Sequence, residues 1–415
     1  MMRQQTGRQV YRRGAMGRRG TETVRAGSRQ QKSGIAGTLL AAGYVDFSLI
    51  LVVFFLAVFG LIMLFSTSSF EAGMKFGDSA YYLKRQAAAT VVGIFVMLFL
   101  SYFPDYHVLS YFAVAGYVLS AGLLLLVLTP LGYEANGAKR WLQVGTASMH
   151  VSVQPAEVAK LAMIIFLATL ICSMRGSAAK SKGFYAVLLL PAPIAAMILL
   201  ITENFSSACI VMGIAVIMLF VATPGYRRFL VMTILAGIAI AGGLYLIFRF
   251  VDPAVNVRVA RLFAWRDLES YADGKGYQTL QGLYAIGSGG FFGKGLGESI
   301  QKTGFVPEAQ NDMIFSIICE ELGLFGGIAV IMMFLLLLWR LMIIAQNAPD
   351  LFGSLLCVGV IGHIAIQVIM NIAVVTNLIP NTGITLPFIS FGGSALVMQM
   401  AEIGVVMNVA RRIRA

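Results

Sequence analysis

Apolar residues along this chain form long continuous runs, and short polar segments separate most of them. A run of about 20 residues lets an α-helix cross the roughly 30 Å hydrocarbon core of a bilayer. A membrane β-barrel would show short alternating segments instead. The pattern predicts an all-α polytopic membrane protein with about ten transmembrane helices and a large extracytoplasmic loop between helices 7 and 8. The expected spans are 45–66, 86–103, 107–128, 155–173, 184–202, 205–223, 229–249, 313–339, 351–376 and 393–410.

The placement of basic residues predicts how the chain crosses the membrane. Lys and Arg gather in the N-terminal tail, at 174–183, at 227–228 and at the C-terminus. A cytoplasmic N-terminus puts these segments on the cytoplasmic side, and an even number of spans returns the C-terminus there. We therefore divide the chain into a disordered basic cytoplasmic tail, 1–43, a ten-helix membrane domain, 44–412, and a cytoplasmic end, 413–415.

Composition agrees with a membrane protein. Of the 415 residues, 58% are hydrophobic and only 12% are charged, about half the charge of a soluble domain. The net charge of +12 does not require a nucleic acid, because the basic tail can contact anionic lipid. A partner site in the tail is the alternative. The four cysteines all lie in apolar runs and predict neither a disulfide nor a metal site. The first apolar run is expected to be a retained first helix.

Polar residues collect in two segments, 129–154 and 250–311, which we expect to build a site on the outer surface. The second segment is the large outer loop, and Asp312 follows it at the start of the eighth span. A carboxylate at the rim of the hydrocarbon is costly, so its presence indicates a function. The structural alternative is that Asn311 or Asp312 is simply the N-cap of the helix.

Two pairs of charged residues have a spacing of three, which puts both members on one helical face. Glu157 and Lys160 form either a structural ion pair or a polar lining of a cavity. Arg258 and Arg261 suit a phosphate or pyrophosphate. The alternative for these arginines is contact with lipid headgroups, with Trp265 as an interfacial anchor.

A glycine-rich stretch precedes Asp312, and it is expected to bring the backbone close to a ligand. Its glycines are Gly287, Gly289, Gly290, Gly293, Gly295 and Gly297. No strand precedes the GKGLGE segment and there is no Walker A motif, so no nucleotide site is predicted. Glu320 and Glu321 lie about 12–14 Å further along the helix, where they either pair with polar groups or belong to a polar path. The three histidines are too scattered to suggest a metal cluster.

Together these motifs resemble the SEDS family of FtsW, RodA and SpoVE. The resemblance extends over residues 45–412 and rests on three groups of segments: NGAKRW with QPAEVAK, YQTLQGLYAIGSGGFFGKGLGESIQK with VPEAQNDMIFSIICEELG, and NLIPNTGITLPFISFGGS. GITLPF is more similar to the FtsW and SpoVE branch, because RodA more often has proline in place of Thr385. Two segments depart from the family pattern. ENFSSA stands where a QPD or EPD type segment is common, and QND stands where HTD is common.

The resemblance implies a peptidoglycan glycosyltransferase, a hexosyltransferase that polymerises lipid II into β-1,4 glycan strands. Its place is the outer face of the cytoplasmic membrane, in septal or related cell-wall synthesis. The implied partners are lipid II and undecaprenyl pyrophosphate, a class B penicillin-binding protein that crosslinks the strands, and other divisome membrane proteins, with no nucleic acid. A divalent cation, Mg²⁺ or Mn²⁺, is the one cofactor left open, and its ligands are unknown. No nucleotide or organic cofactor is implied.

The chemistry of this reaction suits Asp312 as a general base on the 4-hydroxyl of the acceptor GlcNAc, with inversion at C1 of the donor MurNAc. One carboxylate is enough because pyrophosphate is already a good leaving group, unlike the glycosidic oxygen that requires a carboxyl pair. Cations would stabilise the departing charge. The residues expected to bind substrate are Glu157, Lys160, Lys139, Arg140, Trp141, Arg258, Arg261, Lys294, Lys302, Glu308 and Ser390.

Three other functions compete with this one. A transporter that flips lipid II explains the helices and the polar membrane residues, but it needs no base at the outer rim. A non-catalytic divisome scaffold would need surface patches and would tolerate the loss of Asp312, Glu157 and Lys160. A related polyprenyl-linked sugar ligase would differ in its acceptor.

Overall fold

The computed structural model describes residues 46–103, 105–135, 138–146, 149–174, 180–253 and 256–413. The predicted tail at 1–43 lies outside these residues, so the division of the chain into tail and membrane domain stays a prediction.

Each predicted span is occupied by helix. Within the described residues, nine helices are long and apolar enough to cross a membrane. They are α2 (Phe47–Phe76), α3 (Tyr81–Tyr102), α6 (Pro155–Ser173), α7 (Ser181–Leu189) continued by α8 (Ala192–Ile201), α9 (Phe205–Ala222), α10 (Arg227–Phe250), α13 (Ile314–Asn347), α14 (Leu351–Val375) and α15 (Gly393–Ala410). The third predicted span is a short α4 (Val108–Tyr111) followed by the 14-residue α5 (Ala113–Leu126). The chain is a multi-pass helical membrane protein, as the apolar runs predict.

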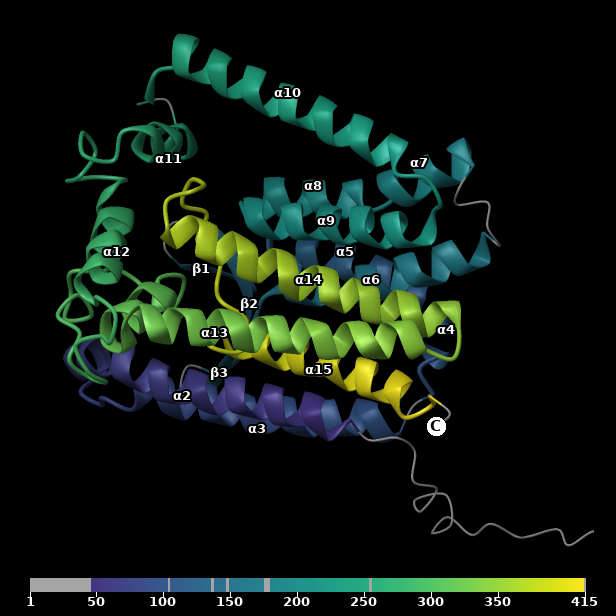
Figure 1. The fold of residues 1–415 in the computed structure, drawn as a ribbon, viewed down its shortest axis with the longest axis horizontal. Coiled ribbons are helices and arrows are strands. Elements are labelled where there is room, and N and C mark those ends of the chain that lie inside the picture. Colours follow the sequence, from purple (N-terminus) through teal and green to yellow (C-terminus); the bar gives the residue numbers. More distant parts are fainter. Residues whose placement is uncertain are drawn as a thin grey trace, which may run out of the picture. The chain divides into compact units, whose positions relative to one another are not determined.

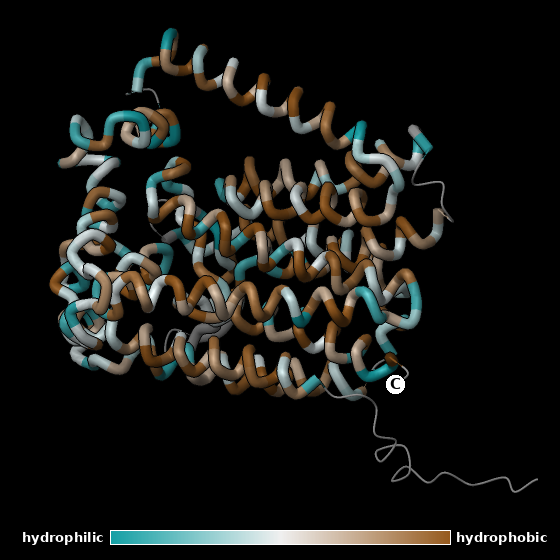
Figure 2. The backbone as a smooth tube through the Cα atoms, in the orientation of Figure 1, coloured by the Kyte–Doolittle hydropathy of each residue, from teal (hydrophilic) through white to brown (hydrophobic). Residues whose placement is uncertain are grey.

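The core of the bundle is built around α14 and α15. α14 packs against α6, α9 and α13, and α15 packs against α3. Figure 2 shows mostly apolar helices with polar residues gathered near their ends. α10 is the exception in packing, because Phe229 is its only buried residue. The Phe229 ring lies 5.1 Å from that of Phe220 on α9, and Figure 1 shows the rest of α10 leading away from α8 and α9. It contacts α11 (Val257–Arg266) through the Phe248 and Phe263 rings, whose centroids lie 5.2 Å apart.

The long segment between α10 and α13 contains α11 and α12 (Tyr277–Ser288). Both lie at the end of the bundle where α13 begins, and the C-terminus lies at the other end (Figure 1). This segment therefore covers one end of the bundle, beside the residues that lead into α13.

The segment 129–154 contains a small sheet that the apolar pattern does not predict. Strands β1 (Gly132–Ala135), β2 (Ala138–Thr146) and β3 (Met149–Val153) pair antiparallel in the order β1-β2-β3. Tyr133 pairs with Trp141 across the first two strands. The sequence signal was the Asn-Gly pair at 136–137, a turn dipeptide that favours a two-residue hairpin.

α13 is broken at Gly323, which has φ of 70° and ψ of −170°. The glycine-rich stretch fills the break with four backbone hydrogen bonds between 2.9 and 3.2 Å. They run from Lys294 N–H to Glu320 C=O, Gly295 N–H to Glu321 C=O, Leu324 N–H to Gly290 C=O and Phe325 N–H to Phe291 C=O. Carbonyl and amide groups freed by the break are thereby satisfied, which a helix inside a membrane requires.

This arrangement explains two of the glycines. A Cβ on Gly289 would lie 2.0 Å from the carbonyl oxygen of Cys319, and a Cβ on Gly293 would lie 2.1 Å from that of Glu321. At both positions the close approach is to the backbone of α13. At these two positions the missing side chain therefore serves the contact with α13, while the approach of the other glycines to a ligand stays a prediction.

Candidate active site

Asp312 lies in the loop that leads into α13 and is 6% exposed. The N-cap of this helix is Met313, with no side-chain capping bond. The alternative in which Asn311 or Asp312 caps the helix is therefore wrong, and another reason is needed for a buried carboxylate here.

Three segments distant in sequence surround Asp312. The Gln278 side chain, on α12, donates from Nε2 to Asp312 Oδ1 at 3.1 Å. Asn371, fully buried on α14, donates from Nδ2 to the Asp312 carbonyl at 2.9 Å. A Cβ on Gly383, which has φ of 69°, would lie 3.8 Å from Asp312 Oδ2. Asp312 is thus contacted by α12, α14 and the loop before α15, and of these α12 and the loop lie beside the carboxylate.

The pKa of Asp312 is raised to about 7, chiefly by burial and also by the nearby Glu308 carboxylate. Its own backbone N–H, the Arg261 guanidinium and the Gln278 hydrogen bond lower the pKa and offset part of the rise. A carboxylate that changes protonation near neutral pH is suited to accept a proton from a substrate hydroxyl.

Arg140 and Arg258 both contact Glu203, whose backbone has φ of 50°. Arg140, on β2, donates from Nε to the Thr202 carbonyl at 3.2 Å and from Nη2 to the Glu203 carbonyl at 3.1 Å. Arg258 Nη2 lies 3.6 Å from Glu203 Oε2. Burial, then Arg261 and Arg258, lower the pKa of Arg140, while Glu203 opposes this. The direction of this shift indicates that the Arg261 and Arg258 guanidinium groups both repel the Arg140 guanidinium.

The arginine cluster, Arg140, Arg258 and Arg261, therefore brings together the residues that sequence assigned to an anion. Asn256 caps α11 by accepting from Arg258 N–H at 2.9 Å, which fixes the start of the helix that carries two of them. The Arg261 guanidinium also lowers the pKa of Asp312, which links the cluster to the carboxylate electrostatically. Guanidinium groups bind pyrophosphate oxygens in bidentate fashion.

Lys294 and Lys302 lie outside the arginine cluster and form ion pairs with the buried Glu320 and Glu321. Lys294 Nζ lies 2.6 Å from Glu320 Oε1, and Lys302 Nζ lies 2.7 Å from Glu321 Oε1. Lys302 also donates to Ser66 Oγ of α2 at 3.1 Å. Of the two interpretations of Glu320 and Glu321, the structure supports pairing with polar groups. Both ion pairs hold the glycine-rich stretch to the part of α13 that precedes the break at Gly323.

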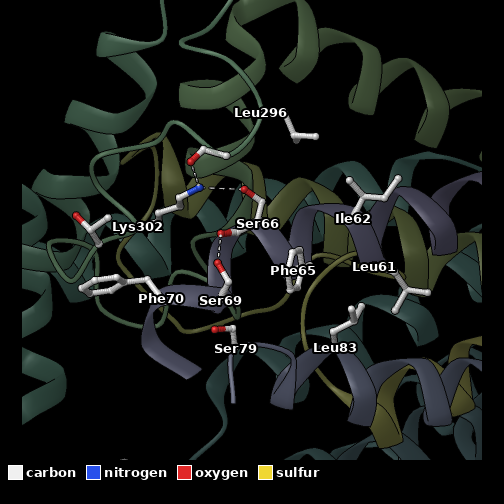
Figure 3. A pocket seen from close by; sticks show the side chains of 12 residues that line it. Leu61, Ile62, Phe65, Ser66, Ser69, Phe70, Ser79, Leu83, Leu296 and Lys302 are labelled. Carbon is white, nitrogen blue, oxygen red and sulfur yellow. Dashed lines mark hydrogen bonds between the residues drawn. The ribbon is translucent and has the colours of Figure 1, made fainter. Parts of the chain in front are cut away.

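Lys302 and Ser66 lie at one end of a groove of about 740 Å³. Figure 3 shows Lys302 reaching Ser66 there, while Leu61, Ile62 and Leu83 line the other end. The groove lies between α2, the start of α3 and the segment 296–303, and its lining combines apolar side chains with serines, Thr303 and Lys302.

Glu157 and Lys160 form the expected pair within the bundle. Their side-chain atoms Oε1 and Nζ lie 2.7 Å apart, and both residues are buried. Lys160 Nζ is 3.5 Å from Gln367 Oε1, and Gln367 donates to the Thr385 carbonyl at 3.0 Å. The pair is thus connected through Gln367 to Thr385, in the loop before α15 that also lies beside Asp312. Glu157 Oε2 is buried and remains an acceptor without a partner among the described atoms.

The remaining predicted binding residues have varied surroundings. Lys139 is exposed on β2, and Trp141 is half-buried on the same strand. Glu308, with φ of 55°, accepts a hydrogen bond from the Asn311 side chain. Ser390 Oγ accepts from Leu386 N–H at 2.8 Å, so it shapes the loop before α15.

Sequence analysis missed Gln278, Asn371 and a second buried pair, His363 and Glu402. His363 Nδ1 and Glu402 Oε2 lie 2.8 Å apart between α14 and α15. For Asn371, His363 and Glu402 the usable signal was a polar residue inside a predicted span. Gln278 had no such signal, because a glutamine in a polar loop is ordinary. Over the described residues, no group of three or more His, Cys, Asp or Glu side chains is arranged to hold a metal ion.

Comparison with known proteins identifies the family. The family model for FtsW, RodA and SpoVE, described as cell cycle protein, matches residues 47–415. Stage V sporulation protein E of Bacillus subtilis (strain 168) is 38% identical over 367 residues, which cover 88% of this chain and 97% of that protein. The probable peptidoglycan glycosyltransferase FtsW of Geobacter sp. (strain M18) is 36% identical over 377 residues, which cover 90% and 98%.

Solved structures agree with this result. A chain of a peptidoglycan synthase complex, solved to describe the structural coordination of polymerization and crosslinking, matches with a TM-score of 0.72 and 27% identity. The match covers 89% of this chain and 98% of that one. The rod shape determining protein RodA of Thermus thermophilus matches with a TM-score of 0.62 and 26% identity, over 89% and 98%. The chain therefore belongs to the family of FtsW, RodA and SpoVE.

Proposed function

We propose that this protein is a peptidoglycan glycosyltransferase that polymerises lipid II into β-1,4 glycan strands. The observation that carries the proposal is Asp312, a buried carboxylate with a pKa of about 7 within the electrostatic reach of Arg261. The relatives named as peptidoglycan glycosyltransferases support the reaction class.

The proposed reaction begins at the acceptor sugar. Asp312 accepts the proton of the 4-hydroxyl of the terminal GlcNAc, because a neutral hydroxyl is a poor nucleophile. The oxygen then forms a bond to C1 of the donor MurNAc as the bond from C1 to the pyrophosphate oxygen breaks. The anomeric centre inverts from α to β, and undecaprenyl pyrophosphate leaves with the electron pair.

The arginine cluster would bind the leaving group. Negative charge grows on the pyrophosphate as the C1–O bond breaks, and fixed cations aimed at that charge lower the barrier. Arg140 is held by two backbone carbonyls at 3.2 and 3.1 Å, so its guanidinium is oriented before substrate arrives. Arg258, whose Nη2 lies 3.6 Å from Glu203 Oε2, would exchange this weak exposed pairing for the pyrophosphate.

A divalent cation, Mg²⁺ or Mn²⁺, is proposed to enter with the substrate. Mg²⁺ keeps most of its waters and commonly binds phosphate oxygens rather than a cage of protein ligands. This fits the absence of a grouped set of metal-ligating side chains among the described residues. The cation would neutralise charge on the pyrophosphate beside the arginines.

The partner, orientation and cellular place extend the proposal. The similarity to a chain of a complex that couples polymerization with crosslinking supports a class B penicillin-binding protein as partner. The basic residues at 227–228 and at the C-terminus support a cytoplasmic location of both termini, with Asp312 on the outer face. The sequence similarity to FtsW and to the sporulation protein SpoVE supports a location at the septum, together with other divisome membrane proteins.

The test is lipid II polymerisation by the purified protein with its class B partner, comparing wild type with Asp312→Asn. Asp273→Asn is the matched control, because Asp273 is an exposed carboxylate of the same outer segment. Glycan strands from wild type and control but not from Asp312→Asn are the expected result. Equal product from Asp312→Asn would remove Asp312 as the base. No product from any protein, with lipid II flipping intact in liposomes, would favour the transporter instead.

A further inference from the structure

The Gln278 side chain is held in one orientation by the groups around it. Its Nε2 donates to Asp312 Oδ1 and to the Pro307 carbonyl, both at 3.1 Å. Its Oε1 accepts from Asn381 Nδ2 at 2.9 Å. A flipped amide would point its oxygen at two acceptors and its N–H groups at a donor, so the network defines the orientation.

Asn381 is oriented in turn by its own loop. Its Oδ1 accepts from Gly383 N–H at 3.0 Å, which leaves the Nδ2 group to face Gln278. Gly383 also lies beside the other oxygen of the carboxylate, since a Cβ there would be 3.8 Å from Asp312 Oδ2. The hydrogen bonds thus run from the loop before α15 through Asn381 and Gln278 to one oxygen of Asp312, and the same loop lies beside the other.

We infer that Gln278 is a positioning residue that aims the Asp312 carboxylate, and that Asn381 fixes Gln278 for this task. Oδ1 receives the Gln278 N–H, and Oδ2 is the oxygen assigned to the proton of the acceptor hydroxyl. The inference rests on the proposed function, because it assumes that Asp312 is the base. It assigns a role in this reaction to a neutral amide on α12.

The physical consequence is a specific effect on the pH dependence. A hydrogen bond donated to a carboxylate favours the charged form, so its loss favours the protonated form. The other groups that act on Asp312 are its own backbone N–H, the Glu308 carboxylate, which raises its pKa, and the Arg261 guanidinium, which lowers it. The Asn371 side chain, from α14, donates to the backbone carbonyls of Asp312 and Ile384 and not to the carboxylate. Gln278 is therefore the neutral side chain whose removal changes the titration of Asp312 most directly.

The experiment measures the rate of lipid II polymerisation against pH for wild type and variants. For wild type, the acid limb of the curve of polymerisation rate against pH should have its midpoint near pH 7. Gln278→Met keeps the length of the side chain and removes the donor, so the midpoint should rise by about one pH unit. Gln278→Glu adds a second negative charge and should raise it further. Asn381→Leu should raise it less, because the Gln278 donor remains but is less well held.

Gln281→Met is the matched control, since Gln281 lies one turn further along α12 and its replacement should leave the midpoint unchanged. An unchanged midpoint in both Gln278 variants, with a uniform loss of rate, would overturn the inference. If a variant is inactive, infrared titration of the carboxyl band that is missing from Asp312→Asn reports the Asp312 pKa directly.

The two proposals fail in different ways. Full activity of Asp312→Asn would refute the base itself, whatever Gln278 does. An inactive Asp312→Asn together with an unshifted acid limb in Gln278→Met and Gln278→Glu would leave the base in place and remove Gln278 as its positioning residue.

Discussion

Replacing Asp312 by Asn should stabilise the folded protein while abolishing polymerisation. Burial raises the pKa of Asp312 from 3.8 to about 7, so the folded protein disfavours the ionised form that the reaction needs. The substitution removes that ionisable group and keeps an oxygen that can accept the Gln278 hydrogen bond. Function and stability therefore oppose each other at this residue.

The size of the effect follows from the pKa difference. One pKa unit corresponds to about 1.4 kcal/mol, so the full cost of the ionised carboxylate is about 4 kcal/mol. Below pH 3.8 the carboxyl is neutral in both states and costs nothing; the cost grows up to pH 7 and is complete above it. Between pH 5 and pH 8, the stability gained by Asp312→Asn should increase by roughly 2–3 kcal/mol.

The assay is thermal unfolding of the purified protein in detergent, followed by intrinsic fluorescence at several pH values. The quantity of interest is the difference in midpoint between Asp312→Asn and wild type, which should widen as pH rises from 5 to 8. The control Asp273→Asn should show no such trend. If the difference in unfolding midpoint stays constant with pH, or narrows at high pH, burial does not destabilise the ionised Asp312 carboxylate and the argument is refuted.

Three further predictions test the rest of the site. Lys302→Met should destabilise the protein by about 3–5 kcal/mol because it leaves the buried Glu321 carboxylate without its cation. In thermal unfolding, the double variant with Glu321→Gln should regain much of the lost stability. Equal instability of the single and double variants would contradict the pairing. Gly293→Ala should lower the unfolding midpoint more than Gly297→Ala, since only at Gly293 would a Cβ meet the α13 backbone, at 2.1 Å; equal effects would deny the close approach. Arg261→Met should lower kcat/KM for lipid II by roughly 10–100-fold. It should also raise the midpoint of the acid limb of the pH–rate profile, and Arg261→Lys should restore this midpoint but not kcat/KM. An unchanged kcat/KM in Arg261→Met would show that Arg261 does not act on the substrate.

Residue spacing was informative wherever the partner lay on the same helix. Glu157 and Lys160 are three residues apart, so one turn of helix was enough to predict their contact at 2.7 Å. The spacing of three also placed Arg258 and Arg261 on one face of a helix. It could not show that Arg140 and Glu203, from other segments, lie near that helix. Lys294 and Lys302 looked like substrate-binding cations because their buried glutamate partners become visible only when α13 and the glycine-rich stretch are brought together.

The sequence by itself determined that the chain is a multi-pass helical membrane protein, because span length and hydropathy are local properties of each apolar run. It also singled out Asp312, since a carboxylate at the rim of a span is unusual wherever the rest of the chain lies. Only the tertiary structure decided what this carboxylate is. Its burial and its contacts with Gln278 and Asn371 depend on α12 and α14, whose approach no local pattern encodes. A pKa is a property of surroundings, so the chemistry of Asp312 exists only once those helices have packed around it.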